Sequence, residues 1–339
     1  MLPAIFGIAG LTLSDAERSF FRSAEPLGFI LFSRNVADRE QLRALTNELR
    51  TLSGRDNLPI LIDQEGGRVA RLGPPEWLTY PAAVDLARGF HDDPARVSRL
   101  VEINFEALAL DLFEVGINVD TAPVLDVLTD ITHKVIGDRA FGANGVQVAR
   151  LGRHCLNGLR LGGVAGVIKH IPGHGRASLD SHEGLPVVHA MDRQLDRDLY
   201  PFMQLADAPM AMTAHIKYTA WDTDLCATLS KPVIYEVIRS RIGFDGLLMT
   251  DDLDMKALNG TVPELAAAAI AAGNDVVLNC WAKMDDMEGV AAALPAASDQ
   301  CLSRLQRAMS GLTPSPSKAT IATRLAALLD ERDRLLALS

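Results

Sequence analysis

The chain has 339 residues, of which 48% are hydrophobic and 22% are charged. This balance is typical of a soluble protein with a sizeable core, and it excludes a disordered chain, a fibre and a small disulfide scaffold. The formal net charge of −10 gives an acidic surface, which disfavours nucleic acid and anionic membranes as partners.

The four cysteines form no Cys-x-x-Cys pair, and we expect reduced, mostly buried thiols. The apolar opening, residues 1–10, has no Lys or Arg before it. It therefore lacks the basic region of a secretory signal and is interpreted as a first core strand. No apolar run approaches the ~20 residues that a membrane-spanning helix needs. These features predict a cytoplasmic protein.

Eight short apolar runs recur along the chain, and they are nearly continuous in apolar character rather than alternating. Strands that are buried on both faces have this character, and parallel sheets consist of such strands. The runs cover residues 4–10, 28–32, 58–62, 117–121, 164–168, 209–213, 246–250 and 275–278.

Amphipathic stretches between these runs predict helices over residues 38–50, from 94 through 108, and over 146–161, 195–205, 231–242 and 263–272. Eight strand–helix units indicate an α/β fold of the (β/α)8 type, a TIM barrel, over about residues 4–285. An open doubly wound sheet is the structural alternative. Two further helical stretches, about 286–339, are expected on the outside of the barrel, so that residues 1–339 form one domain.

Polar side chains follow several of the predicted strands. They are Asp63 after the third, Lys169 and His170 after the fifth, His215 after the sixth, Asp251 after the seventh and Asn279 after the last. The carboxyl ends of barrel strands share one rim, where catalytic residues usually lie. Because buried charges need partners, packing alone explains several of them poorly. A single functional cluster is the better interpretation.

The loop over residues 169–182 contains three histidines, at positions 170, 174 and 182. They lack the helical spacing of a zinc pair, and the loop lacks the Gly-Lys-Ser/Thr of a phosphate loop. We therefore expect no metal and no cofactor. Asp180 and His182 lie two residues apart, so on an extended segment the carboxylate reaches the imidazole. The alternative is a solvated pair of side chains with no partnership.

Asp251 directly follows a strand, which places it nearest the centre of the rim. Asp252 and Asp254 are each interpreted as possible caps of the next helix. We expect cationic neighbours to keep Asp251 ionised and to hold a polyhydroxyl substrate. The candidate donors are Arg71, Arg139, Lys169 and His170.

Several motifs resemble those of the β-N-acetylhexosaminidases of glycoside hydrolase family 3. They are KHIPGHG (169–175) with DSH (180–182), DQEGGRV (63–69), GFDGLLMTDDL (243–253), GFILFSRN (28–35) and DRAFG (138–142). The resemblance runs from about residue 4 to about residue 280. Small departures, such as Met249-Thr250 where Phe-Ser is common, concern fine specificity rather than the reaction.

This resemblance implies a retaining exo-hydrolase that removes terminal β-linked N-acetylglucosamine during bacterial peptidoglycan recycling. The implied substrate is N-acetylglucosamine linked to 1,6-anhydro-N-acetylmuramic acid, with or without its peptide. By the resemblance, Asp251 is the nucleophile and His182 the acid/base, with Asp180 as its partner. The implied sugar-binding residues are Asp63, Arg71, Arg139, Lys169 and His170.

Two other functions are consistent with parts of the sequence. A lysine at a barrel rim suits a Schiff-base aldolase, in which Lys169 would be the nucleophile. A catalytically silent sugar-binding protein is the second alternative, although aromatic residues make up only 5% of the chain. For the hydrolase we expect a monomer that acts on a small-molecule substrate and has no nucleic-acid or membrane partner.

Overall fold

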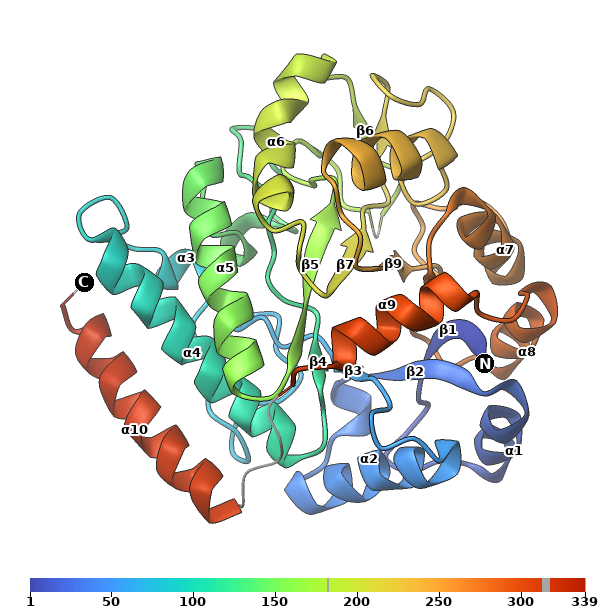
Figure 1. The fold of residues 1–339 in the computed structure, drawn as a ribbon, viewed down its shortest axis with the longest axis horizontal. Coiled ribbons are helices and arrows are strands. Elements are labelled where there is room, and N and C mark those ends of the chain that lie inside the picture. The colour runs from blue at the N-terminus through green and yellow to red at the C-terminus, as the bar shows by residue number, and fades with distance from the viewer. Residues whose placement is uncertain (182, 313–317, 339) are drawn as a thin grey trace.

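The computed structural model describes residues 1–181, 183–312 and 318–338. Eight parallel strands form a closed barrel in the order β1-β10-β9-β7-β5-β4-β3-β2 (Figure 1). They are β1 (Leu2–Gly7), β2 (Pro26–Leu31), β3 (Ile60–Ile62), β4 (Val119–Asp120), β5 (Ala165–Ile171), β7 (Met210–Thr213), β9 (Leu247–Asp252) and β10 (Val276–Asn279). Each lies at one of the eight predicted apolar runs, so the prediction of a (β/α)8 barrel is confirmed.

The first strand closes the barrel. Ile5 of β1 lies opposite Gly28 of β2 on one side and Leu278 of β10 on the other. Because β1 is paired along both edges, the sheet has no open end, and this excludes the doubly wound alternative. A small parallel pair outside the barrel, β6 (Val187–Val188) with β8 (Lys217–Tyr218), was not predicted.

Helices surround the barrel. Six of the eight described α- and π-helices before the C-terminal part lie at the predicted amphipathic stretches, whereas the first and the third in chain order were not predicted. The eight helices are α1 (Asp15–Ala24), α2 (Arg39–Ser53), α3 (Ala83–Leu86), α4 (Pro94–Glu114), α5 (Gly145–Leu161), α6 (Asp192–Gln204), a π-helix (Val233–Arg241) and α7 (Val262–Ala272). Short-range signals determine several of their starts. The Asp38 side chain accepts a hydrogen bond from the Gln41 N–H at the start of α2, and Pro94 occupies the first turn of α4, where a missing N–H costs nothing.

The C-terminal part contains three described helices, α8 (Met284–Ala293), α9 (Asp299–Met309) and α10 (Lys318–Leu336), rather than the two stretches predicted. The break after α8 has a local cause, because Pro295 cannot continue a helix and Ser298 caps the next one. Helix α10 packs along α4 (Figure 1), where Arg99 Nε lies 2.8 Å from Glu331.

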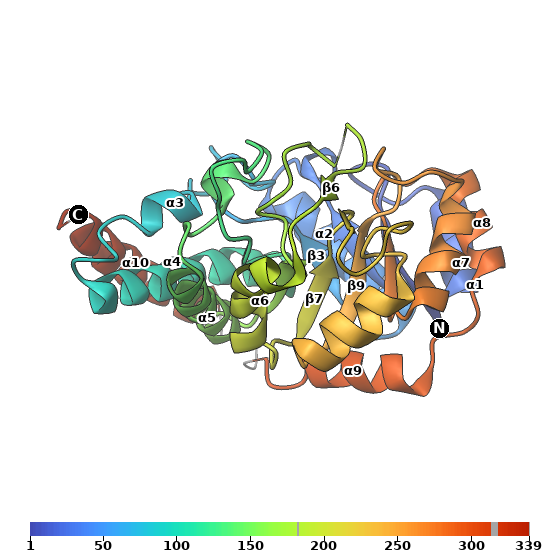
Figure 2. The same cartoon turned by 90° about the horizontal axis from the view of Figure 1, so that it is seen from above.

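Helix α9 lies beneath the barrel, on the side opposite the long loops (Figure 2). Its Cys301, Ala308 and Met309 pack with interior side chains of the barrel such as Leu27 and Val276. The prediction placed the tail helices on the outside of the barrel, but it did not include that α9 closes the amino-terminal opening. The interpretation of residues 1–339 as one domain stays a prediction.

Buried apolar side chains of this kind fill the barrel and the layer between its strands and helices. All four cysteines are free and buried, as predicted. Within the described residues, no helix is long and apolar enough to cross a bilayer.

Candidate active site

Asp63 follows β3 at the carboxyl end of the barrel. Its Oδ2 accepts a hydrogen bond from Arg71 Nη2 at 2.8 Å, and its Oδ1 accepts one from the Thr121 hydroxyl. Lys169 Nζ lies 3.5 Å from the same Oδ1. Burial alone would raise the pKa of Asp63, but the Lys169 ammonium and the Arg71 guanidinium bring it below its ordinary value. Asp63 is therefore a carboxylate with fixed orientation.

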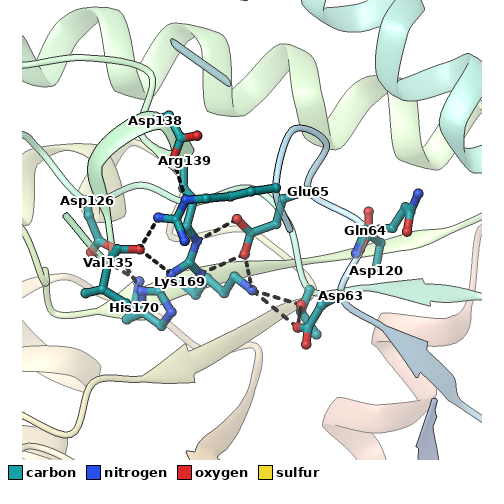
Figure 3. A network of polar contacts seen from close by, with 12 residues as sticks. Asp63, Gln64, Glu65, Asp120, Asp126, Val135, Asp138, Arg139, Lys169 and His170 are labelled. Atoms are coloured by element: carbon teal, nitrogen blue, oxygen red, sulfur yellow. Dashed lines mark hydrogen bonds and ion pairs between the residues drawn. The ribbon is translucent and has the colours of Figure 1, made fainter. Parts of the chain in front are cut away.

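Glu65 is a member of this cluster to which the sequence interpretation assigned no role. Arg139 binds it in a two-point ion pair, with Nε to Oε2 and Nη2 to Oε1 both at 2.8 Å, and Lys169 Nζ lies 2.6 Å from Oε1 (Figure 3). Burial opposes ionisation, but the two cations lower the pKa of Glu65 to about 2. The sequence did offer a signal for Glu65, because it lies two residues after Asp63 in the DQEGGRV motif.

His170 is held by Asp126, which the sequence interpretation also missed. His170 Nδ1 lies 2.8 Å from Asp126 Oδ2 (Figure 3). Burial would raise the pKa of Asp126, but the His170 imidazole lowers it, so the carboxylate only accepts and Nδ1 carries the donated proton. Nε2 is then the ring nitrogen left to meet a ligand. Asp126 lies beyond the end of β4, far from His170 in sequence, and no quoted motif includes it.

The first part of the glycine-rich loop, through residue 175, is buried. Asp126 Oδ1 also accepts a hydrogen bond from the His174 N–H at 2.6 Å, and burial lowers the pKa of the His174 imidazole to about 4. A side chain at Gly175 would overlap the Val127 carbonyl oxygen, so only glycine permits this approach. His174 therefore supports the loop as a neutral side chain. No group of three or more metal-binding side chains occurs among the described residues.

Asp251 is the penultimate residue of β9, at the strand end where the sequence pattern placed it. Burial alone would raise its pKa, but the His215 and His170 imidazoles lower it, helped by the Asp252 N–H, which donates to Oδ1 at 2.8 Å. The pKa of Asp251 is thereby below its ordinary value. Of the donors predicted for it, His170 and Lys169 act on Asp251, whereas Arg139 is paired with Glu65 and Arg71 with Asp63.

The two following carboxylates do not cap the next helix, and that prediction is wrong. Thr261 caps α7. Asp252 Oδ1 instead accepts the Cys280 N–H at 3.1 Å, and burial raises the pKa of Asp252 to about 6. Asp254 pairs with Lys283 at 2.6 Å. These contacts join the end of β9 to the turn after β10.

A cavity of about 800 Å³ opens at this end of the barrel, and Asp63, Arg71 and Asp251 all line it. Its size lies in the range of small-molecule binding sites. Most of the residues that line this cavity come from the ends of β9, β10 and β2 and from the segments that follow them. The barrel thus brings a carboxylate with a lowered pKa and a set of fixed charged groups to one open cleft.

The chain matches known proteins over most of its length. The model of the glycosyl hydrolase family 3 N-terminal domain matches residues 10–310. The chain belongs to glycoside hydrolase family 3. It is 42% identical to a β-hexosaminidase of Alkalilimnicola ehrlichii over 82% of this chain and 80% of that protein. It is 39% identical to a β-hexosaminidase of Chromobacterium violaceum over 90% of this chain and 86% of that protein.

The solved structures agree with these relatives. Native NagZ from Neisseria gonorrhoeae is 30% identical and superimposes with a TM-score of 0.88 over 99% of this chain and 97% of that one. The chain is therefore a β-hexosaminidase, a glycoside hydrolase. The resemblance seen in the sequence motifs is confirmed.

In this hexosaminidase, the loop that carries the predicted acid/base lies at the same end as Asp251. His182 itself lies outside the described residues. Next to it, the Ser181 carbonyl accepts a hydrogen bond from the Ala257 N–H at 3.1 Å. The Asp180 carbonyl accepts from Glu183 and Gly184 within the loop. The Ser181 contact joins this loop to the segment that follows Asp251.

Lys169 of the hexosaminidase is enclosed by acidic and hydroxyl groups. Its ammonium lies against Asp63 and Glu65, and it donates to the Thr121 hydroxyl at 2.9 Å. Its side chain is only 3% exposed. A Schiff-base lysine needs a free amine that faces the substrate, so this placement, together with the family, argues against the aldolase alternative.

Proposed function

We propose that the enzyme is a retaining exo-β-N-acetylglucosaminidase. Its substrate in this proposal is N-acetylglucosamine linked to 1,6-anhydro-N-acetylmuramic acid, with or without peptide, and its role is peptidoglycan recycling in the cytoplasm. The observation that carries the proposal is Asp251, a half-buried carboxylate whose pKa is lowered, in a cavity that Asp63 and Arg71 also line. A complex of gonococcal NagZ with N-trifluoroacetyl-D-glucosamine supports the choice of sugar.

In this proposal, five charged or imidazole side chains hold the terminal sugar: Asp63, Arg71, Arg139, Lys169 and His170. Hydrogen bonds from hydroxyl groups to ionised partners are stronger than neutral ones. The ion pairs within the cluster hold these groups in place before the sugar arrives, so little ordering is required on binding. Charged groups around one end of the sugar are also consistent with exo cleavage.

The proposed reaction has two steps. Asp251 attacks the anomeric carbon as its bond to the departing oxygen breaks, and His182 gives its proton to that oxygen. Asp180 would stabilise the imidazolium form of His182. His182 then takes a proton from water as the water attacks the glycosyl-aspartate, which releases the sugar with its configuration retained and restores both groups. A carboxylate nucleophile must be ionised, and the lowered pKa of Asp251 meets that requirement.

A chromogenic β-N-acetylglucosaminide tests the proposal. Replacing Asp251 with Asn keeps the size of the side chain but removes the nucleophile, so we expect kcat to fall by at least about 1,000-fold. The circular dichroism spectrum and thermal transition should show that the variant is folded. An Asp251→Asn variant that retains more than a tenth of wild-type turnover would rule out this nucleophile.

A second substitution tests the acid role. His182→Ala should lose much more activity on substrates with poor leaving groups than on those with good ones, because a good leaving group departs without protonation. Equal losses on both kinds of substrate would contradict the acid/base assignment while leaving Asp251 in place. The measurement is kcat/KM across a series of aryl glycosides of known leaving-group pKa.

A further inference from the structure

The cleft extends well beyond the cluster that holds the proposed terminal sugar. That cluster comes from the segments after β3, β4 and β5, whereas β9, β10 and β1 lie across the barrel from them, and β2 adjoins β3. The cavity wall on this opposite side includes Lys256, after β9, and Trp281, after β10, whereas Phe32 and Arg34, after β2, continue the wall toward Arg71. Asp251, on β9, lies on the same side of the barrel as Lys256 and Trp281. With the terminal sugar held by the cluster and its anomeric carbon at Asp251, we expect the departing group to extend away from the cluster, into the part of the cleft that Lys256 and Trp281 line.

Trp281 is the most exposed large apolar side chain on that wall, at 60% exposure. Single exposed apolar residues are common on protein surfaces. What distinguishes Trp281 is its position at an active-site cavity, in a chain where only 5% of the residues are aromatic. The other two tryptophans are far less exposed: Trp77 is 3% exposed and Trp221 is partly buried.

The turn that carries Trp281 is held in place. The preceding Cys280 donates its N–H to Asp252 Oδ1 at 3.1 Å, and its carbonyl accepts a hydrogen bond from Arg34. Beyond the turn, Lys283 pairs with Asp254 at 2.6 Å. These contacts fix the turn against the strand that carries Asp251. An indole on a fixed turn loses little conformational entropy when it binds a ligand.

The backbone of this turn is also strained. Ala282 has φ +56°, in the left-handed region that residues other than glycine rarely adopt. At Gly7 of β1, any side chain would overlap the Cys280 carbonyl oxygen, so glycine is required for the turn to approach so closely. Strain of this kind persists only where surrounding contacts impose it, and it is commonest at ligand sites.

The wall also carries a positive charge that is unpaired among the described residues. Lys283 forms an ion pair with Asp254, and Arg34 donates hydrogen bonds to the main-chain carbonyls of Ile8 and Cys280. Lys256 is exposed, and the described part of the chain offers it no ion-pair partner. In a chain with a formal net charge of −10, an unpaired ammonium at the mouth of the cleft favours an anionic group on the ligand.

We propose that Trp281 and Lys256 form a subsite for the departing group, and that they select a sugar ring that bears a carboxylate. The indole packs on the apolar face of the ring, and the Lys256 ammonium faces the acidic substituent. This inference rests on the proposed function and adds to it the two residues that recognise the second ring. Neither residue acts on the terminal sugar.

The experiment compares two disaccharides with the same terminal N-acetylglucosamine, β-1,4-linked either to N-acetylmuramic acid, which carries a carboxylate, or to neutral N-acetylglucosamine. Trp281→Ala should lower kcat/KM roughly tenfold on both, as expected for loss of a large aromatic contact. Trp281→Phe should retain most of the activity. Lys256→Gln should lower kcat/KM roughly threefold on the acidic disaccharide only, in keeping with one exposed charge pair.

Matched controls come from the other end of the barrel. Tyr235 is 51% exposed and lines a different cavity, and Lys231 lies beside its ring. Tyr235→Ala and Lys231→Gln should leave kcat/KM on both disaccharides unchanged. Competitive inhibition by free N-acetylglucosamine reports on the terminal-sugar positions alone, and it should be the same in the wild type and in the Trp281 and Lys256 variants.

The outcomes separate the two proposals. Wild-type turnover of the disaccharides, with Trp281→Ala and Lys256→Gln both within twofold of it, would overturn the subsite and leave the proposed function standing. A parallel change in inhibition by free N-acetylglucosamine would also overturn the subsite, since the residues would then act on the terminal sugar or on the fold. No wild-type turnover of either disaccharide would overturn both proposals together.

Discussion

Two networks of buried ion pairs lie at opposite ends of the barrel. At the carboxyl ends of the strands, Lys169 and Arg139 bind Glu65, and Lys169 also meets Asp63. At the amino ends, Asp275 binds Arg304 of α9 through Oδ1 at 2.8 Å and Arg239 through Oδ2 at 2.7 Å.

The two networks are alike in charge and burial but differ in what surrounds them. We call the network at the carboxyl ends the upper network and the one at the amino ends the lower network. Asp275 also accepts a hydrogen bond from the Leu248 N–H at 2.8 Å, so the lower network joins α9 to the starts of β9 and β10. The upper network borders a cavity that also contains Asp251. A cluster of buried charges is therefore not a functional signal by itself. The upper network indicates function because it lies at the open end of the barrel, beside the ionised Asp251.

Of the changes that test this comparison, the largest effect is expected from removing Lys169 from the network at the carboxyl ends. Lys169→Met keeps the length of the side chain but leaves Asp63 and Glu65 with fewer positive partners. Breaking a buried pair from one side costs about 3–5 kcal/mol of folding free energy. We also expect kcat/KM on a chromogenic N-acetylglucosaminide to fall at least about 100-fold, because the sugar loses a charged contact. Denaturant unfolding and steady-state kinetics measure the two effects.

Arg304→Met is the matched change in the lower network. It should cost a similar 3–5 kcal/mol of stability, but the folded enzyme should keep its kcat/KM within about twofold, because Arg304 is remote from the cleft. The kinetics must be measured at a temperature where the variant is folded. A loss of activity as large as that of Lys169→Met would show that the two ends are functionally coupled, contrary to this comparison.

Replacing Asp252 should have a smaller effect on folding stability, and of opposite sign. Burial raises its folded pKa to about 6, above the ordinary value of about 4 in the unfolded chain. The folded protein therefore holds a proton that the unfolded chain has lost between about pH 4 and 6, so this residue reduces stability as the pH rises through that window. Asp252→Asn should be more stable than the wild type by about 1–3 kcal/mol at pH 7.

The same comparison at low pH provides the control. Below about pH 4 Asp252 is protonated in both states, so the advantage of Asp252→Asn should disappear. Urea unfolding at pH 4, 5, 6 and 7 measures the trend. A stability difference that does not change with pH would mean that the pKa of Asp252 is not raised.

Much of the fold was predictable because its signals are local. Continuous apolar runs marked all eight barrel strands, and Asp38 and Pro94 marked helix starts, since capping and strand burial depend on residues close in sequence. The break between α8 and α9 was missed although Pro295 marks it. The placement of α9 under the barrel was missed for another reason: an amphipathic helix does not specify which apolar surface it covers.

The sequence by itself determined the family, the barrel and the strand ends from which Asp63, Lys169, His170 and Asp251 project. These follow from patterns within a few residues and from the one-sided geometry of parallel strands. Only the tertiary structure decided the partners. Glu65 meets Arg139 and Lys169, Asp126 orients His170, and Arg34 fastens the turn that carries Trp281. Such contacts join residues from different strands, and the distance between them is set by barrel closure rather than by spacing along the chain.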